Sequence, residues 1–247
     1  MIFPTHFIFL YMEGLLVTTD YNSLEKSDNI RVVYDKTTDL VWIDTPSIQS
    51  LYEFIDLGLP SGTKWASCNV GATKPEEFSL YFAWGETEGY SGITNTKKFT
   101  ELDYKYCNGS ISALTKYNYN STFGRVDNLT TLELVDDAAY VSDKTCRMPT
   151  KADFQELTAN TTNTLVTLNG VNGRKFTSKT NGNSIFVPSA GQCYNGSVSL
   201  VGTIGCLWSG SLHDNGPGGS WLFIFYPNSV GIYSNLRYYG CPVRAVL

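Results

Sequence analysis

Charged side chains are scarce in this sequence. Only 17% of its 247 residues are Asp, Glu, Lys or Arg, against roughly 25% in an average domain. The 18 basic and 23 acidic residues give a net charge of −5, and no run of basic residues occurs. A nucleic-acid-binding groove is therefore not expected, since such grooves carry clustered Lys and Arg.

Histidine is almost absent: the chain has only His6 and His213. A Ser-His-Asp or Cys-His site would have to use His213, which lies in a Gly, Pro and Asn loop without a motif, so we interpret it as a surface residue. Metalloprotease, P-loop and dinucleotide motifs are missing. The adjacent carboxylates Asp136 and Asp137 would face different ways on a helix and suit a solvated helix N-terminus better than acid–base chemistry. The sequence predicts no catalytic residue, no cofactor and no metal.

The cysteines form no CxxC pair, which excludes a zinc ribbon or a thioredoxin-type site. Their even number leaves disulfides open, but we favour mostly free, partly buried thiols. The six are Cys68, Cys107, Cys146, Cys193, Cys206 and Cys241.

An ordinary export signal and a membrane span are also missing. Residues 1–17 are apolar but interrupted by Pro4, His6 and Glu13, with no Lys or Arg before the apolar stretch. No segment approaches the roughly 20 apolar residues of a spanning helix. If the protein acts outside a cell, either a signal has been lost or another route releases it, such as cell lysis that frees virus particles.

Apolar residues are plentiful, at 42% with 14% aromatic, which excludes a long disordered chain. The 22 Gly and 9 Pro, with many Asn, Ser and Thr, argue against a helical bundle. Two short apolar runs, 30–34 and 40–43, flank a polar loop and predict a hairpin. We assign residues 1–53 to an attachment segment, with the first strands of the main domain as the alternative, and residues 54–247 to that domain.

The main domain combines two helices with short strands and long loops, an α+β class. Helices are predicted at 132–141, where Leu134, Ala138 and Val141 share a face, and at 150–158, where Thr150 and Asp153 form a capping box. Residues 87–131 and 191–205 read as loops. Strands are expected at 55–59, 64–70, 185–188, 221–226, 230–233 and 243–246.

The C-terminal 40 residues, 208–247, carry only three charged residues, Asp214, Arg237 and Arg244. Aromatic residues are frequent among Gly, Ser and Asn, the composition of adaptable binding loops. In residues 221–226 the odd and even positions lie on opposite faces of a strand, and both faces are apolar. A binding surface is favoured, while a buried second sheet face or a subunit interface remains the alternative.

Segments along residues 54–247 resemble, in order, the Fibrobacter-type major paralogous domain, a family related to the DUF1566 proteins within the C-type lectin-like superfamily. They are IDLGLPSGTKWA (55–66), CNVGA (68–72), YFAWGE (81–86), YKYCN (104–108), DDAA (136–139), RMPT (147–150), FQEL (154–157), WSGS (208–211), Trp221, Gly240 and VRAV (243–246).

The resemblance implies a C-type lectin-like fold, with two helices, pairing of its N- and C-terminal strands, and long loops. It also implies display and ligand binding rather than one fixed chemistry. The superfamily includes the formylglycine-generating enzymes, whose paired active-site cysteines are not found here, so the chain is not expected to be an enzyme.

Members of this superfamily are the usual targets of diversity-generating retroelements, which vary a C-terminal repeat, here about residues 200–247. The resemblance implies an invariant scaffold that includes Trp208, Trp221, Arg237, Gly240 and Arg244. Between these positions it implies a variable, ligand-binding face made of Leu207, His213, Leu222, Ile224, Tyr226, Gly231, Tyr233, Ser234, Leu236, Tyr238, Tyr239 and Cys241. Cys206 and Cys241 are then varied positions rather than disulfide partners.

The expected function is a non-enzymatic receptor-binding protein for a cell-surface protein or glycan. A phage tail-fibre tip on a virion is favoured, and such tips are commonly homotrimers. A secreted or cell-surface adhesin of a gut bacterium is the alternative, and an enzyme of the same fold is a third. The calcium-and-sugar motif of true C-type lectins is absent, so a protein ligand is at least as well supported as a carbohydrate.

Overall fold

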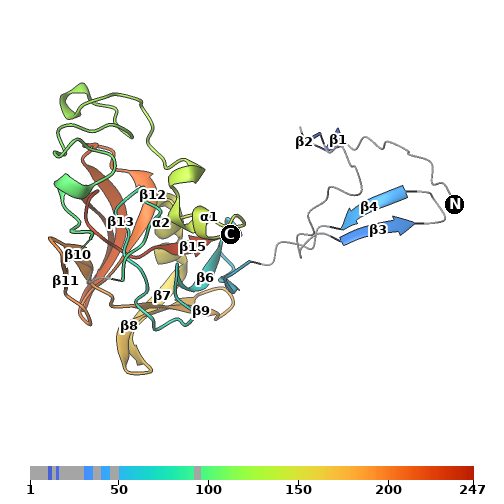
Figure 1. The fold of residues 1–247 in the computed structure, drawn as a ribbon. Helices are drawn as coiled ribbons and strands as arrows, with labels where there is room; N and C mark the ends of the chain where they lie inside the picture. The colour runs from blue at the N-terminus through green and yellow to red at the C-terminus, as the bar shows by residue number, and fades with distance from the viewer. Residues whose placement is uncertain (1–10, 13–14, 17–30, 36–39, 45–49, 92–95) are drawn as a thin grey trace. The chain divides into compact units, whose positions relative to one another are not determined.

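The computed structural model describes residues 11–12, 15–16, 31–35, 40–44, 50–91 and 96–247 (Figure 1). The chain divides into two compact units, residues 1–49 and 50–247. In the first, β1 (Tyr11–Met12) pairs with β2 (Leu15–Leu16), and β3 (Arg31–Asp35) pairs with β4 (Leu40–Asp44). The second ladder agrees with the predicted hairpin, while the attachment role of this unit remains a prediction.

The larger unit is α+β, with short antiparallel sheets and two helices. Its strand orders are β15-β6-β5, β7-β8-β9, β10-β11 and β12-β13-β14. The elements are β5 (Phe54–Asp56), β6 (Lys64–Asn69), α1 (Ala138–Ser142), α2 (Lys151–Asn160), β7 (Thr161–Leu168), β8 (Val171–Ser178), β9 (Ser184–Pro188), β10 (Gln192–Tyr194), β11 (Ser197–Ser199), β12 (Gly205–Leu212), β13 (Gly219–Tyr226), β14 (Ser229–Leu236) and β15 (Arg244–Val246).

The end of the chain returns to the start of this unit. β15 pairs with β6 through Arg244↔Asn69 and Val246↔Trp65, and β5 pairs with the other side of β6. Figure 1 shows β15 beside β6 near the C-terminus. Between β6 and α1, the described residues form isolated bridges and three 3-10 turns, η1 (Glu101–Asp103), η2 (Ser121–Phe123) and η3 (Leu134–Asp136).

The sheet β12-β13-β14 lies between two hydrophobic clusters. On one face of β13, Phe223 and Phe225 pack in a cluster with Phe154 of α2. On the other face, Leu222 and Ile224 belong to the cluster that contains Trp84 and Trp208. The predicted alternation along residues 221–226 is therefore confirmed, and the second face is covered by the domain's own core.

Helix α2 begins where its capping box predicts. The Thr150 hydroxyl accepts a hydrogen bond from the Asp153 N–H at 3.2 Å, and the Asp153 carboxylate accepts one from the Thr150 N–H at 2.7 Å. These bonds satisfy amides that have no partner within the helix. Phe154 and Leu157 form its buried face, as expected.

The helix predicted at 132–141 is wrong in extent and in its buried face. Helix α1 covers only 138–142, because the Asp137 carboxylate accepts the N–H groups of Ala139 and Tyr140 and so caps the helix there. Leu134 and Val141 are 53% and 40% exposed. Of the predicted face only Ala138 is buried, together with its neighbour Ala139.

The predicted loop 191–205 contains a hairpin, β10-β11. Tyr194 pairs with Ser197 across a two-residue turn, Asn195-Gly196. Both turn residues have positive φ, 50° and 73°. Asn-Gly favours this type of turn, whose twist matches that of paired strands.

None of the six cysteines forms a disulfide, which agrees with the prediction of mostly unbridged thiols, and all six are buried rather than partly buried. Within the described residues, no helix is long and apolar enough to cross a membrane, and no cluster of three His, Cys, Asp or Glu side chains has the arrangement of a metal site.

Candidate ligand-binding surface

The structure divides the predicted variable residues into exposed and buried sets. Tyr226, Tyr233 and Leu236 are 43%, 49% and 38% exposed, and Ser234 is also exposed. His213, Gly231 and Tyr239 are partly exposed. Most of these residues lie on β14, on its hairpin turn with β13, or in the loop that follows β12.

The remaining predicted binding residues are buried, so their side chains face the core rather than a ligand. Ile224 and Leu222 face the cluster around Trp84 and Trp208, whereas Leu207 faces the cluster around Phe223. These residues are buried because both faces of the sheet are packed. The alternation of side chains along a strand does not by itself reveal that the second face is covered. The predicted binding residues that are buried are Leu207, Leu222, Ile224, Tyr238 and Cys241.

A groove of about 420 Å³ opens where β14 ends beside the loop between β12 and β13. The predicted residues His213, Ser234 and Leu236 line it. Four other lining side chains were not predicted: Ile111, Phe123, Asn215 and Asn235. Ile111 and Phe123 come from the long segment before α1, where no periodic pattern marks them.

Trp221 contacts the side chains of His213 and Lys151 beside this groove. The His213 ring lies 4.5 Å from the Trp221 ring, and the Lys151 ammonium lies 3.7 Å from its centroid. Lys151 also donates to Asp214 at 2.7 Å. This hydrogen bond lowers the pKa of the Asp214 carboxyl. A cation over an indole ring is favourable, so the cluster holds the 213–214 backbone beside the sheet.

Arg237, predicted as scaffold, is fully buried just beyond β14. Its Nε donates to the Tyr104 hydroxyl at 2.9 Å. Its terminal nitrogens donate to the carbonyls of Lys116, Tyr117 and Pro217, at 3.0, 3.1 and 3.0 Å. The guanidinium thus joins the groove loop to the long segment before α1, and the planar fork suits several fixed carbonyls at once.

The other scaffold residues hold the sheet to its surroundings. Trp208 Nε1 donates to the Phe82 carbonyl at 2.8 Å, and Trp84 Nε1 donates to the Ser209 carbonyl at 2.7 Å. The two tryptophans thereby connect the 81–86 segment to β12. A Cβ at Gly240 would lie 2.7 Å from the Phe99 ring, so a larger residue there would force the core apart.

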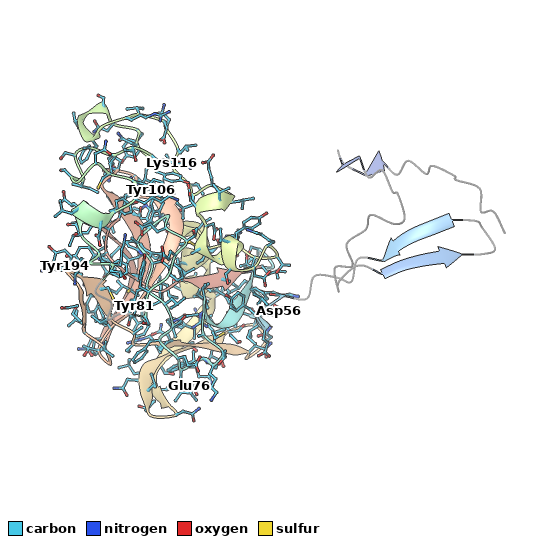
Figure 2. All side chains as sticks on the ribbon, in the orientation of Figure 1. Asp56, Glu76, Tyr81, Tyr106, Lys116 and Tyr194 are labelled. Atoms are coloured by element: carbon cyan, nitrogen blue, oxygen red, sulfur yellow. The ribbon has the colours of Figure 1, made fainter. Side chains whose placement is uncertain are left out.

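A stack of tyrosines lies next to the β10-β11 hairpin. The rings of Tyr194 and Tyr239 are parallel within 5° at 4.6 Å, and Tyr238 stacks on Tyr239 at 5.4 Å. Figure 2 shows Tyr194 at the outer margin of the unit. Tyr238 is buried under this stack, which explains why it cannot offer a free face.

Asp136 and Asp137 are both buried, so the prediction of a solvated pair is wrong. Asp137 caps α1, whereas Asp136 accepts hydrogen bonds from the Tyr117 hydroxyl and the Lys116 ammonium, both at 2.6 Å, and from the Tyr106 hydroxyl. Figure 2 shows Tyr106 and Lys116 in the same region. Asp136 thus anchors the segment that also supplies acceptors to Arg237.

The Asp136 carboxylate makes the domain sensitive to acid. Burial would raise its pKa, but hydrogen bonds from Lys116, Tyr106, Tyr117 and Lys105 outweigh burial and lower it to about 2. The unfolded value is about 3.9, so Asp136 contributes about 2 kcal/mol above pH ~5, which is lost as the pH falls toward 2. Urea unfolding should show Asp136→Asn less stable than the parent at pH 6, with a gap that shrinks by about that amount at pH ~2.5. A gap independent of pH would contradict this assignment.

Comparisons of the chain with protein-family models, with curated proteins and with solved structures found no match.

Proposed function

We propose that this protein is a non-enzymatic receptor-binding protein whose larger unit is a C-type lectin-like domain. The observation that carries the proposal is the groove and the exposed β14 surface, which are formed in part by residues predicted to vary and are supported by the buried scaffold of Arg237 and Trp208. Exposed Tyr, Ser, Asn and Leu side chains on a rigid framework are suited to recognition, because little conformational entropy is lost on binding.

Two features of the architecture support the C-type lectin-like assignment. The C-terminal strand β15 pairs with β6 near the start of the unit, as the resemblance implies. The long segment between β6 and α1 is anchored by Arg237 and Asp136 rather than by regular sheets. The family assignment itself rests on the sequence segments.

The biological setting that we favour is a phage tail-fibre tip, with residues 1–49 as the unit that attaches it to the particle and a homotrimer as the assembly. The second candidate is a surface adhesin of a gut bacterium. Neighbouring genes separate these settings: tail genes support the phage, and a reverse transcriptase with a template repeat supports diversification. The ligand is a cell-surface protein or glycan.

The binding surface is tested by changing His213, Tyr233 and Leu236 together to Ala. Labelled protein is applied to a panel of intact gut-bacterial strains and binding is measured by flow cytometry. We expect the triple variant to bind about tenfold or more weakly, since a few central residues carry most of the energy of an interface.

The matched control changes three exposed residues of β7, Thr162, Thr164 and Leu165, to Ala. These substitutions remove similar exposed surface from a strand of another sheet, so binding should be retained. Equal binding by both triple variants, with both folded by circular dichroism, would place the receptor site elsewhere.

A further inference from the structure

Strand β14 is an open edge of its sheet. It pairs with β13 along its whole length, from Gly219↔Leu236 to Tyr226↔Ser229, with no shift in register. The order β12-β13-β14 places it at the end of the sheet, and none of the described residues pairs with its other side. An open edge presents backbone groups that a further strand can bind.

The ladder pattern identifies which backbone groups point outward. Just beyond β14, the Arg237 N–H donates to the Gly218 carbonyl at 3.2 Å. Because antiparallel ladders alternate between bonded and non-bonded pairs, the odd residues of β14 bond to β13 and the even residues point outward. On the other side of β13, the His213 N–H donates to the Gly219 carbonyl, which fits the same alternation. The outward residues are Val230, Ile232, Ser234 and Leu236.

Within the described part of the chain, only one of these outward amides donates a hydrogen bond. The Leu236 N–H donates to the Asn235 side chain at 2.8 Å. The N–H groups of Val230, Ile232 and Ser234 have no such partner and form a row at alternate positions. The strand sequence, SVGIYSNL, contains no charged residue and no proline, the devices that usually block pairing at an edge.

The groove is continuous with this edge. Ser234 and Leu236 line it, and its far wall includes the apolar side chains of Ile111 and Phe123. A chain that pairs with the outward groups of Ser234 and Leu236 would pass beside the groove, which could bury one of its side chains.

We propose that β14 captures an extended, uncharged segment of a protein ligand as an additional strand, and that the groove receives an apolar side chain of that segment. This inference rests on the proposed function and specifies its ligand as protein rather than glycan. Backbone hydrogen bonds would supply affinity for any extended chain, while the groove and the exposed side chains of β14 would supply specificity.

A second copy of this chain fits the edge less well. In an antiparallel pair of two β14 strands the outward residues of each copy lie opposite one another, so Asn228 or Val230 of the other copy would lie opposite Leu236 at the groove. Asn228 is polar, and Val230 is small beside a groove of about 420 Å³ that Ile111, Phe123 and Leu236 make largely apolar. A ligand segment with an apolar side chain at this position matches the groove better.

The probe for the test is a phage-displayed library of random linear dodecapeptides, panned against the full chain. Ser234→Pro removes an outward N–H while the inward bonds of Tyr233 and Asn235 remain, and edge strands tolerate proline at such positions. Ser234→Ala keeps the N–H. Leu165→Pro is the matched control on β7, the edge strand of another sheet. The Lys179 N–H donates to the carbonyl of Asn160, just before β7, so by the same alternation the backbone N–H of Leu165 points outward.

We expect selected peptides to bind the parent and Leu165→Pro alike. We expect them to bind Ser234→Pro about tenfold or more weakly than Ser234→Ala, since the proline variant loses a hydrogen bond and its ring obstructs pairing. Peptides with N-methyl groups at alternate residues provide a measurement on the parent protein, where one of the two methylation registers should abolish binding. In NMR hydrogen exchange, a bound peptide should slow the amides of Val230, Ile232 and Ser234.

Several results would overturn strand capture. They are a library that yields no binder, peptides that bind Ser234→Pro as well as the parent, tolerance of both methylation registers, or a peptide-free dimer in which the outward amides of β14 are already protected. In the cell-binding assay, loss of binding by the triple variant but not by Ser234→Pro would leave the receptor function standing and reject strand capture. Retention by both would place the receptor site elsewhere on the molecule and reject the proposed binding surface.

Discussion

Replacing Arg237 with methionine is expected to lower the free energy of unfolding by about 3–5 kcal/mol, near the upper end for a single substitution. Methionine fills much of the space but cannot donate to the Tyr104 hydroxyl or to the carbonyls of Lys116, Tyr117 and Pro217. Each buried acceptor left without a partner costs about 1–3 kcal/mol. Urea unfolding followed by tryptophan fluorescence measures the loss.

The same substitution should also weaken ligand binding. Arg237 holds the Pro217 carbonyl, in the loop that forms the groove, against the segment before α1. Without the Arg237 guanidinium, that loop must become ordered when the ligand binds. The conformational entropy lost in that step reduces affinity. Arg237→Lys keeps the charge but not the planar fork, so its stability should be intermediate. A loss below about 1 kcal/mol for the methionine variant would show that the carbonyls find other partners.

The second large effect is expected at Arg244, where methionine should again cost about 3–5 kcal/mol. Arg244 is fully buried and donates to the Asn69 side chain and to the carbonyls of Ala66 and Phe186, at 2.9, 2.9 and 3.0 Å. Burial lowers its pKa to about 10, so it remains a cation at neutral pH. It joins β15 to β6 and β9, and its loss should release the C-terminal strand.

The two arginine variants test stability and binding separately. The hydrogen-bond partners of Arg244 lie outside the groove lining. Arg244→Met should therefore bind the selected peptides with unchanged affinity at temperatures where it stays folded, whereas Arg237→Met should not. Equal loss of binding in both variants would show that the groove depends on the whole domain rather than on its local framework.

Features with a local cause could be predicted from the sequence. The Thr150–Asp153 capping box involves residues three apart, so the start of α2 follows from their chemistry. The alternation along β13 likewise follows from the pleat. The Asn195-Gly196 turn also has a local signal, because Asn-Gly favours a two-residue hairpin turn. The apolar spacing from 132 to 141 also suits a longer helix. The start of α1 depends instead on Asp137, whose role as the cap the spacing does not indicate.

The lining of the groove could be predicted only in part. The resemblance pointed to the stretch of chain that contains β14, and His213, Ser234 and Leu236 of that stretch line the groove. It could not separate them from Leu222 and Ile224, since both faces of β13 are apolar and only the packing of other segments determines which face reaches solvent. Ile111 and Phe123 carried no signal, because their place in the groove depends on contacts with residues about 100 positions away.

The sequence by itself determined the α+β class, the cap of α2 and the strand character of the C-terminal region, since each depends on composition or on near neighbours. The tertiary structure alone decided which C-terminal side chains are exposed, where β14 leaves its edge open, and what Arg237 and Asp136 bind. Those properties come from packing between distant segments, such as Arg237 with Tyr104 and Pro217. Burial and hydrogen bonding at such distances depend on the completed fold rather than on any local pattern.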